Sequence, residues 1–161
     1  MLGKHEGIAA YTVGQRARIG GLNAKYFVAE KGDENNLLVA KGTKHPALYS
    51  DMCFVTNKFF NWIGVPPVEL ERGLVCHYRV RHRQELGTCV AFLIRDEKED
   101  GGVVLQVNFD VPHRGVTQEQ AVVLYGFNGR CYGGGPISKV GPSYYRQNKE
   151  LPENIPGWHM T

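Results

Sequence analysis

Basic side chains recur at every second position between residues 77 and 83, in a segment whose composition is typical of a β-strand. In a strand from Leu74 to Arg83, successive side chains point to opposite faces, so one face carries four basic groups. They are His77, Arg79, Arg81 and Arg83. A guanidinium group forms paired hydrogen bonds with phosphate, so this row is suited to following a nucleic-acid backbone. The opposing interpretation is a solvated strand face balanced by the acidic segment at 95–100, and spacing alone favours neither.

A glycine-flanked loop at 14–21 holds a second group of candidates, Gln15, Arg16 and Arg18. Thr12 is placed to cap one or two helical turns that run through Arg18. Backbone N–H groups and guanidinium groups there could converge on an anion. The segment lacks the G-K-[ST] ending of a nucleotide-binding P-loop, so a structural turn is favoured over an anion site.

Other residue types that could do chemistry show no useful spacing. The four cysteines, Cys53, Cys76, Cys89 and Cys131, form no C-x-x-C pair, which argues against a zinc ribbon, a redox pair or a disulfide framework. We expect reduced, mostly buried thiols of an intracellular protein. The histidines lack metal-ligand spacing, so no metal site is predicted. The glycine-rich segment 131–137 is followed by no helix pattern, which indicates a close-packed or bulged strand instead of a phosphate cradle.

The elements that must position these residues are short strands, because glycines (20 in all) and prolines separate runs of β-branched and aromatic residues. Segments 25–31 and 37–41, joined by the turn sequence GDENN, predict a β-hairpin. The type of structure at 45–63 stays open because no periodicity is clean there. The two prolines at 66 and 67 place a domain boundary near 64–73.

Five further strands are predicted after that boundary, with turn signals at 97–102 and 128–129. They are 74–83, 88–95, 103–110, 121–127 and 130–140. In 103–110 apolar side chains alternate, which predicts one buried face. The fold class is therefore mostly β: a small mixed β-rich central domain (1–70), a closed antiparallel β-barrel (74–142) and a flexible tail (143–161).

The composition of the chain limits the class of protein and the kinds of partner that are possible. Hydrophobic residues are 42% and charged residues 22% of the chain, as in ordinary globular proteins, and the net charge of +3 permits a polyanionic partner without requiring one. No apolar run approaches membrane-spanning length and no signal-peptide pattern opens the chain, so no membrane partner is expected. Any targeting peptide of a longer parent is expected to have been lost.

Six blocks, in order and spacing, resemble one known family. They are GKHEGIAAYTVGQRARIGGL, KGDENNLLVAKGTKHPALYS with NWIGVPP, YRVRHRQ, VTQEQAVVLY and CYGGGPI. Together they cover residues 3 to about 142 and resemble the tRNA-specific 2-thiouridylases of bacteria and mitochondria. The resemblance implies the family's central domain followed by a barrel similar to that of translation factors. The likeness of GQRARIGGL and GPSYY to animal members implies a mitochondrial parent, the alternative being a cytoplasmic one.

The resemblance also implies a division of labour. The family's pyrophosphate loop and both catalytic cysteines belong to an N-terminal domain that has no match here, so this chain has no expected catalytic residue or cofactor of its own. In the parent, ATP with Mg²⁺ activates the wobble uridine, and a cysteine persulfide, fed by a sulfur-donor protein through the missing domain, delivers the sulfur. The family positions for tRNA contact fall on Arg81, His82 and Gln120. We add Arg79 and Arg83 from the basic row, and assign Gln15, Arg16 and Arg18 to tRNA or domain-interface contact.

Two other classes of function stay open on the sequence alone. A freestanding protein-interaction or translation-factor-like barrel would bind a protein and show no salt-dependent tRNA affinity. A flavin-binding small barrel would make the purified protein yellow.

Overall fold

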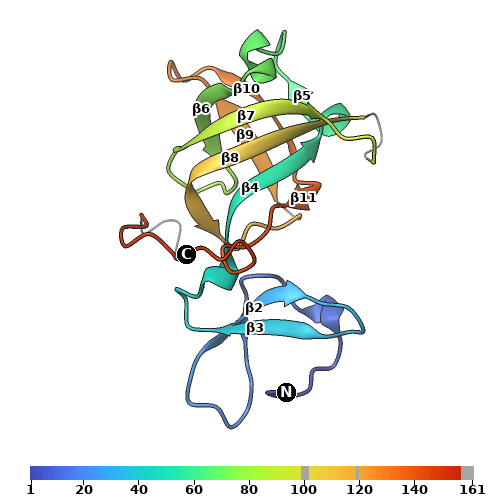
Figure 1. Ribbon diagram of the computed structural model, residues 1–161, viewed down its shortest axis with the longest axis vertical. Helices are drawn as coiled ribbons and strands as arrows, with labels where there is room; N and C mark the ends of the chain where they lie inside the picture. The colour runs from blue at the N-terminus through green and yellow to red at the C-terminus, as the bar shows by residue number, and fades with distance from the viewer. Residues whose placement is uncertain (99–101, 119, 157–161) are drawn as a thin grey trace. The chain divides into compact units, whose positions relative to one another are not determined.

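The computed structural model describes residues 1–98, 102–118 and 120–156. They form short strands joined by turns and short 3-10 helices, so the protein is mostly β, as predicted (Figure 1). The chain divides into two compact units. The first contains Met1–Ser50, His113–Val116 and the segment that starts at Pro142, and the second contains Asp51–Pro112 and Thr117–Gly141. This division differs from the predicted one, because the chain leaves the first unit at residue 50 and returns to it twice.

The first unit is built on a three-stranded antiparallel sheet in the order β1-β2-β3. The strands are β1 (Arg16–Ala17), β2 (Tyr26–Lys31) and β3 (Leu37–Lys41), with 3-10 helices η1 (Ile8–Ala10) and η2 (Pro46–Leu48). The predicted hairpin at 25–41 is confirmed. Glu34 and Asn35 in its turn have φ near +55° and +61°, which asparagine tolerates well at such positions.

The segment after Pro142 packs within the first unit, unlike the flexible tail predicted for 143–161. Leu151 and Ile155 pack against a buried cluster formed by Ala40, Leu48 and Tyr49. The Tyr144 N–H donates to the carbonyl of Tyr49 at 2.9 Å. The sequence analysis missed these two apolar residues because the segment around them is polar. Residues 157–161 lie outside the described part of the chain.

The second unit is an eight-stranded antiparallel sheet in the order β11-β4-β8-β7-β6-β9-β10-β5, in which β4, β8 and β7 lie side by side (Figure 1). It also contains η3 (Asn57–Phe59) and η4 (Val68–Glu71). The strands are β4 (Tyr49–Thr56), β5 (Asn61–Trp62), β6 (Leu74–Arg79), β7 (Gly87–Arg95), β8 (Val103–Arg114), β9 (Ala121–Tyr125), β10 (Cys131–Pro136) and β11 (Lys139–Val140). The stretch at 45–63 left open by the sequence is thus mainly a strand. The predicted turn at 97–102 includes residues 99–101, which are not described.

The sheet forms a curved half-barrel, so the prediction of a closed barrel is wrong in this respect. Across the described residues, the order of paired strands ends at β11 on one side and β5 on the other. Each of these edge strands has only 2 residues, too few to form a closing ladder.

Apolar side chains at alternate positions of the strands fill the interior of the half-barrel. Leu105, Val107 and Phe109 on β8 are buried as predicted, and the Phe109 ring stacks on Tyr78 with centroids 4.3 Å apart. Val104 is also buried, at 2% exposure, so the predicted alternation is incomplete at the start of β8. None of the short helices in the described part of the chain has the length and apolar character needed to cross a membrane.

The glycine run in β10 lets two strands approach closely. A Cβ on Gly133 would collide with the carbonyl oxygen of Asn61 in β5, and one on Gly135 would lie 2.8 Å from the carbonyl oxygen of Phe59. The pairing of β10 with β9 shifts register between Cys131 and Gly133. The predicted close-packed, bulged strand is confirmed.

Candidate nucleic-acid interface

The basic row predicted on one strand is divided between a strand and a loop. β6 ends at Arg79, so the predicted strand to Arg83 is four residues too long. The next backbone N–H, of Val80, donates to the side-chain oxygen of Gln84 at 3.0 Å, and the Gln84 N–H donates to the carbonyl of Arg81 at 3.2 Å. Because these bonds close a turn, the chain cannot continue as a strand there.

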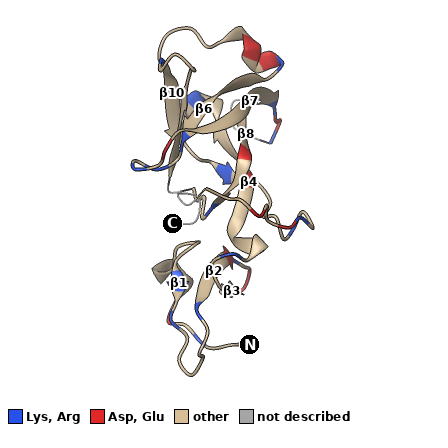
Figure 2. Cartoon of the chain, turned by 90° about the vertical axis from the view of Figure 1, so that its left-hand side faces the viewer, with Lys and Arg blue, Asp and Glu red and all other residues tan. Residues whose placement is uncertain are grey.

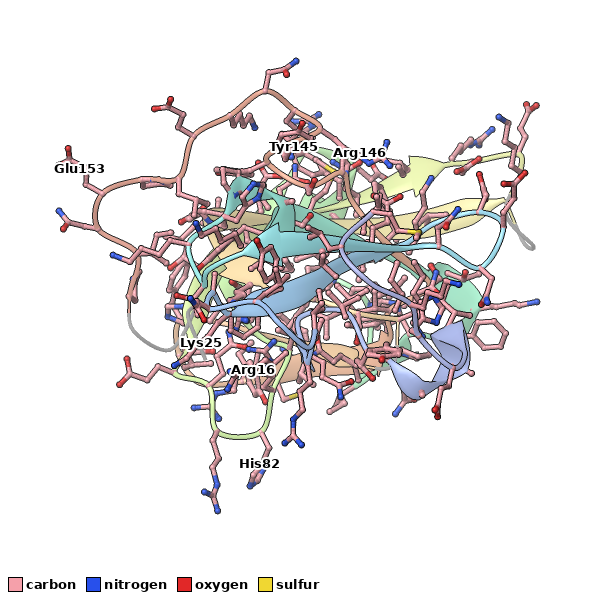
Figure 3. All side chains as sticks on the ribbon, turned by 90° about the horizontal axis from the view of Figure 1, so that it is seen from below. Arg16, Lys25, His82, Tyr145, Arg146 and Glu153 are labelled. Carbon is pink, nitrogen blue, oxygen red and sulfur yellow. The ribbon has the colours of Figure 1, made fainter. Side chains whose placement is uncertain are left out.

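The turn presents basic side chains to solvent. His82 and Arg83 are exposed and Arg81 is half-buried. Figure 3 shows the His82 side chain extending outward from this loop. Exposed basic groups on a loop fixed at both ends can reach phosphate oxygens with little loss of backbone freedom on binding.

His77 and Arg79 remain on the outer face of β6, where their neighbours are aromatic. The Phe127 ring lies edge-on to His77 at 4.6 Å, and the Arg79 guanidinium lies 6.0 Å from the Tyr125 ring centroid. The sequence analysis did not select Tyr125 or Phe127. Their spacing of two along the predicted strand 121–127 was the available signal, although β9 ends at Tyr125 and Phe127 lies in the turn that follows.

Gln120 lies at the same end of the sheet as the basic loop. β6 and β9 are antiparallel, with His77 opposite Tyr125 and Arg79 opposite Val123. The end of β6 therefore meets the start of β9, which follows Gln120. The Gln120 side-chain oxygen accepts a hydrogen bond from the Thr117 N–H at 3.2 Å, so part of its amide stabilises the local turn. Its neighbour at position 119 lies outside the described residues.

The candidates Gln15, Arg16 and Arg18 lie in the first unit. The Gln15 side chain accepts from the Thr12 N–H at 3.0 Å, so Thr12 takes part in a turn, not the predicted helix cap. Arg16 and Arg18 are exposed on either side of buried Ala17. The two basic groups of the chain thus belong to different units.

Arg114, which the sequence analysis missed, supports this loop from beneath. Its guanidinium Nη2 donates to the carbonyl of Gly14 at 3.2 Å, and the guanidinium carbon lies 4.7 Å from the Phe27 ring centroid. Burial lowers the pKa of Arg114, and the nearby Tyr49 opposes that shift. Because arginine ionises far above neutral pH, the group remains a cation that fixes the backbone at Gly14.

Three of the four cysteines are buried and the fourth, Cys131, is half-buried, as predicted. Cys76 and Cys89 face each other across β6 and β7 with sulfurs 3.6 Å apart. Burial raises the pKa of the Cys53 thiol, so it stays protonated at neutral pH. The described residues contain no group of three or more side chains arranged to hold a metal ion.

Two family models match the chain. One, described as an aminomethyltransferase β-barrel domain, covers residues 53–137, and the other, a tRNA methyl transferase PRC-barrel domain, covers residues 1–41. Among similar proteins, a tRNA-specific 2-thiouridylase MnmA of Protochlamydia amoebophila is 39% identical over 96% of this chain and 39% of its own length. The mitochondrial tRNA-specific 2-thiouridylase 1 of Rattus norvegicus is 38% identical over the whole chain and 37% of its own length.

A third relative, the tRNA-specific 2-thiouridylase MnmA of Shouchella clausii, is 42% identical over 86% of this chain and 36% of its own length. The chain thus spans less than two fifths of the length of each of these relatives. The two family models follow one another along the chain in the order that the six sequence blocks indicate. The chain belongs to the tRNA-specific 2-thiouridylase family.

Proposed function

We propose that this chain is the tRNA-binding portion of a tRNA-uridine 2-sulfurtransferase. The observation that carries the proposal is the shared position of the loop at 81–83 and Gln120 at one end of the β6–β9 pair. Residues from two distant parts of the sequence thus lie at the same end of one strand pair. The relatives' names, which specify tRNA, support the same ligand.

In this proposal the chain binds and orients tRNA, and the chemistry belongs to the parent's other domain. That domain uses ATP with Mg²⁺ to activate uridine and a cysteine persulfide to supply sulfur from a donor protein. The glycine-rich β10 does not fit ATP phosphates, because Gly133 and Gly135 are already packed against backbone atoms. These residues are therefore not expected to bind ATP. The chain alone is expected to form no 2-thiouridine.

The parent's compartment is part of the same proposal. The relatives include mitochondrial proteins of mammals as well as bacterial ones. We place the parent in mitochondria, on the likeness of GQRARIGGL and GPSYY to animal members. Fractionation of cells that express the full parent, with 2-thiouridine measured in mitochondrial and cytosolic tRNA, tests this placement.

The binding experiment measures tRNA affinity across a series of salt concentrations. Arg83→Ala, and separately Arg81→Ala, should weaken binding and reduce the slope of log K against log salt by about one each. Arg95→Ala is the matched control, since this exposed arginine ends β7 at the other end of the hairpin. Equal affinity and slope for all variants would reject the loop as the tRNA contact.

A protein-interaction module remains the second candidate because apolar side chains are exposed near η4. Ile63, Val65 and Val68 are 55%, 84% and 80% exposed. Exposed apolar groups in one stretch are typical of protein-binding surfaces. This candidate predicts a chain without salt-dependent tRNA affinity, which the same experiment measures.

A further inference from the structure

A row of side chains crosses the outer face of the second unit. His77 on β6 lies opposite Thr88 on β7 and opposite Tyr125 on β9. The buried side chains of β6, Cys76 and Tyr78, point to the other face. His77 and Tyr125 therefore stand side by side on the solvent-facing surface of adjacent strands.

Two contacts extend this row into an aromatic and cationic face. Phe127 lies edge-on to His77 with ring centroids 4.6 Å apart, yet 64% of the residue remains exposed. Arg79 lies beside the Tyr125 ring, 6.0 Å from its centroid. The face thus offers accessible ring surface next to a fixed positive charge.

The strands that carry this face contain no carboxylate. The structure describes every residue of β6, β7, β9 and β10, and none is Asp or Glu. Acidic side chains lie elsewhere in this unit, for example in η4 (Figure 2). Strands that combine aromatic rings with arginine and carry no carboxylate complement a ligand with planar groups and negative charge.

Two nitrogens on this face also lack a hydrogen bond. Arg79 Nε and His77 Nδ1 are shielded from solvent, and neither has a partner among the described residues. Unpaired buried polar atoms are costly, so their presence on one face calls for an explanation. A small rearrangement on ligand binding would give Arg79 an acceptor.

We propose that the face formed by His77, Arg79, Tyr125 and Phe127 binds unpaired nucleotides of the tRNA. Bases stack on Phe127 and Tyr125, and Arg79 supplies positive charge for the adjoining phosphate. This inference rests on the proposed tRNA-binding function and adds to it a site for single-stranded RNA. Sequence-tolerant stacking suits this face, because every base has a π-face and the surface offers few fixed donors for base edges.

The apolar group near η4 does not share these properties. Val65 and Val68 are aliphatic and lie close in sequence to Glu69 and Glu71, which would repel phosphate. The choice of RNA for the β6–β9 face therefore rests on charge and ring content, not on exposure alone.

The test uses the whole chain and a short fluorescein-labelled single-stranded oligoribonucleotide, alone or annealed to its complement. Fluorescence anisotropy at fixed salt measures the affinity of each. Phe127→Ala should weaken single-strand binding about tenfold. It should leave duplex binding unchanged, because paired bases are already stacked. Phe127→Tyr should restore the affinity.

Phe59→Ala is the matched control, since Phe59 is 58% exposed but lies in η3, outside the strands β6 and β9. Photocrosslinking with 5-iodouridine in the single strand, followed by mass spectrometry, should identify peptides containing Tyr125 or Phe127. A wild-type chain that does not bind the single strand overturns the proposal, as does a Phe127→Ala variant of unchanged affinity.

The loop variants separate this proposal from the proposed function. If Arg83→Ala weakens tRNA binding while Phe127→Ala has no effect on either probe, the stacking face is rejected and tRNA binding through the loop stands. If Arg83→Ala leaves tRNA affinity unchanged while Phe127→Ala weakens the binding of both the tRNA and the single strand, the face is supported and the loop is rejected.

Discussion

The side-chain oxygen of Gln84 accepts a hydrogen bond from the backbone N–H of Val80 at 3.0 Å and so closes the loop that carries Arg81, His82 and Arg83. Gln84 is only 5% exposed, which is unusual for glutamine. A buried amide that satisfies the backbone at the end of a strand fixes the direction of the exposed basic side chains.

Gln84→Ala should destabilise the protein by about 1–3 kcal/mol, because the buried Val80 N–H loses its acceptor. Urea unfolding measures this change. The tRNA affinity of the folded variant should also fall, because the loop loses a fixed end. Gln84→Met, which keeps most of the volume but not the acceptor, separates the hydrogen bond from the cavity. A Met variant as stable as the wild type contradicts the role given to the bond.

Gln120 combines a structural and a proposed binding role, which two substitutions separate. Gln120→Ala removes the acceptor for the Thr117 N–H and should lower stability by about 1 kcal/mol. Gln120→Glu keeps that acceptor but loses the amide donor and adds negative charge, so it should melt normally and bind tRNA more weakly. Normal tRNA affinity of the Glu variant would remove Gln120 from the interface.

Gly133→Ala should destabilise the second unit by about 3 kcal/mol, since the new Cβ meets the Asn61 carbonyl and lies 2.9 Å from the Phe60 ring. The backbone φ of +147° adds strain for any other residue. Thermal unfolding followed by circular dichroism measures the effect. Gly20→Ala, where nothing lies within 4 Å of the new Cβ, should change stability by less than about 0.5 kcal/mol.

Stability should fall at alkaline pH because burial raises the pKa of the Cys53 thiol. Below the ordinary thiol pKa of about 8.5 both states are protonated and the full stability is present. Above it only the unfolded chain ionises, so Cys53 contributes a loss of about 1.4 kcal/mol per pH unit until its folded pKa is reached. Urea unfolding between neutral and alkaline pH should show a shallower decline for Cys53→Ala. An unchanged pH profile would contradict this assignment.

Removal of the chain after Gly141 should destabilise the first unit, because Leu151 and Ile155 would no longer cover Tyr49 and Leu48. Hydrogen exchange should then report lost protection in β2 and β3. Arg146→Ala is a milder change, since it removes only the ion pair with Glu30, whose two side chains are 57% and 43% exposed. A truncated chain with normal protection would restore the prediction of a flexible tail.

Local sequence signals predicted the elements that depend on local interactions. The turn at Glu34 and Asn35 and the alternation around Val107 are examples, because turn chemistry and strand period are encoded within a few residues. The predicted strand failed beyond Arg79 because the side chain of Gln84, four residues after Val80, accepts a hydrogen bond from the Val80 N–H and closes a turn, which the strand period does not encode. The anchors Leu151 and Ile155 were missed for a related reason: isolated apolar residues in a polar segment have no period to detect.

The sequence predicted the basic and amide residues of the proposed interface but not its aromatic residues. Arg81, His82 and Gln120 came from family resemblance, and their common location required the register of β6 with β9. Tyr125 and Phe127 were assigned to an ordinary strand because aromatic residues are common in sheets. The cross-strand pairing of Tyr125 with His77 and the 64% exposure of Phe127 separate these residues from the core.

The first unit draws on three separated stretches of the chain, and this fixes the order of events during synthesis. All strands of the second unit have been synthesised once Gly141 is translated, whereas the first unit still lacks Leu151 and Ile155. The second unit can therefore fold first, while the apolar cluster of β2 and β3 is still incomplete. The first unit, although its strands β2 and β3 precede the second unit in the sequence, is completed after it.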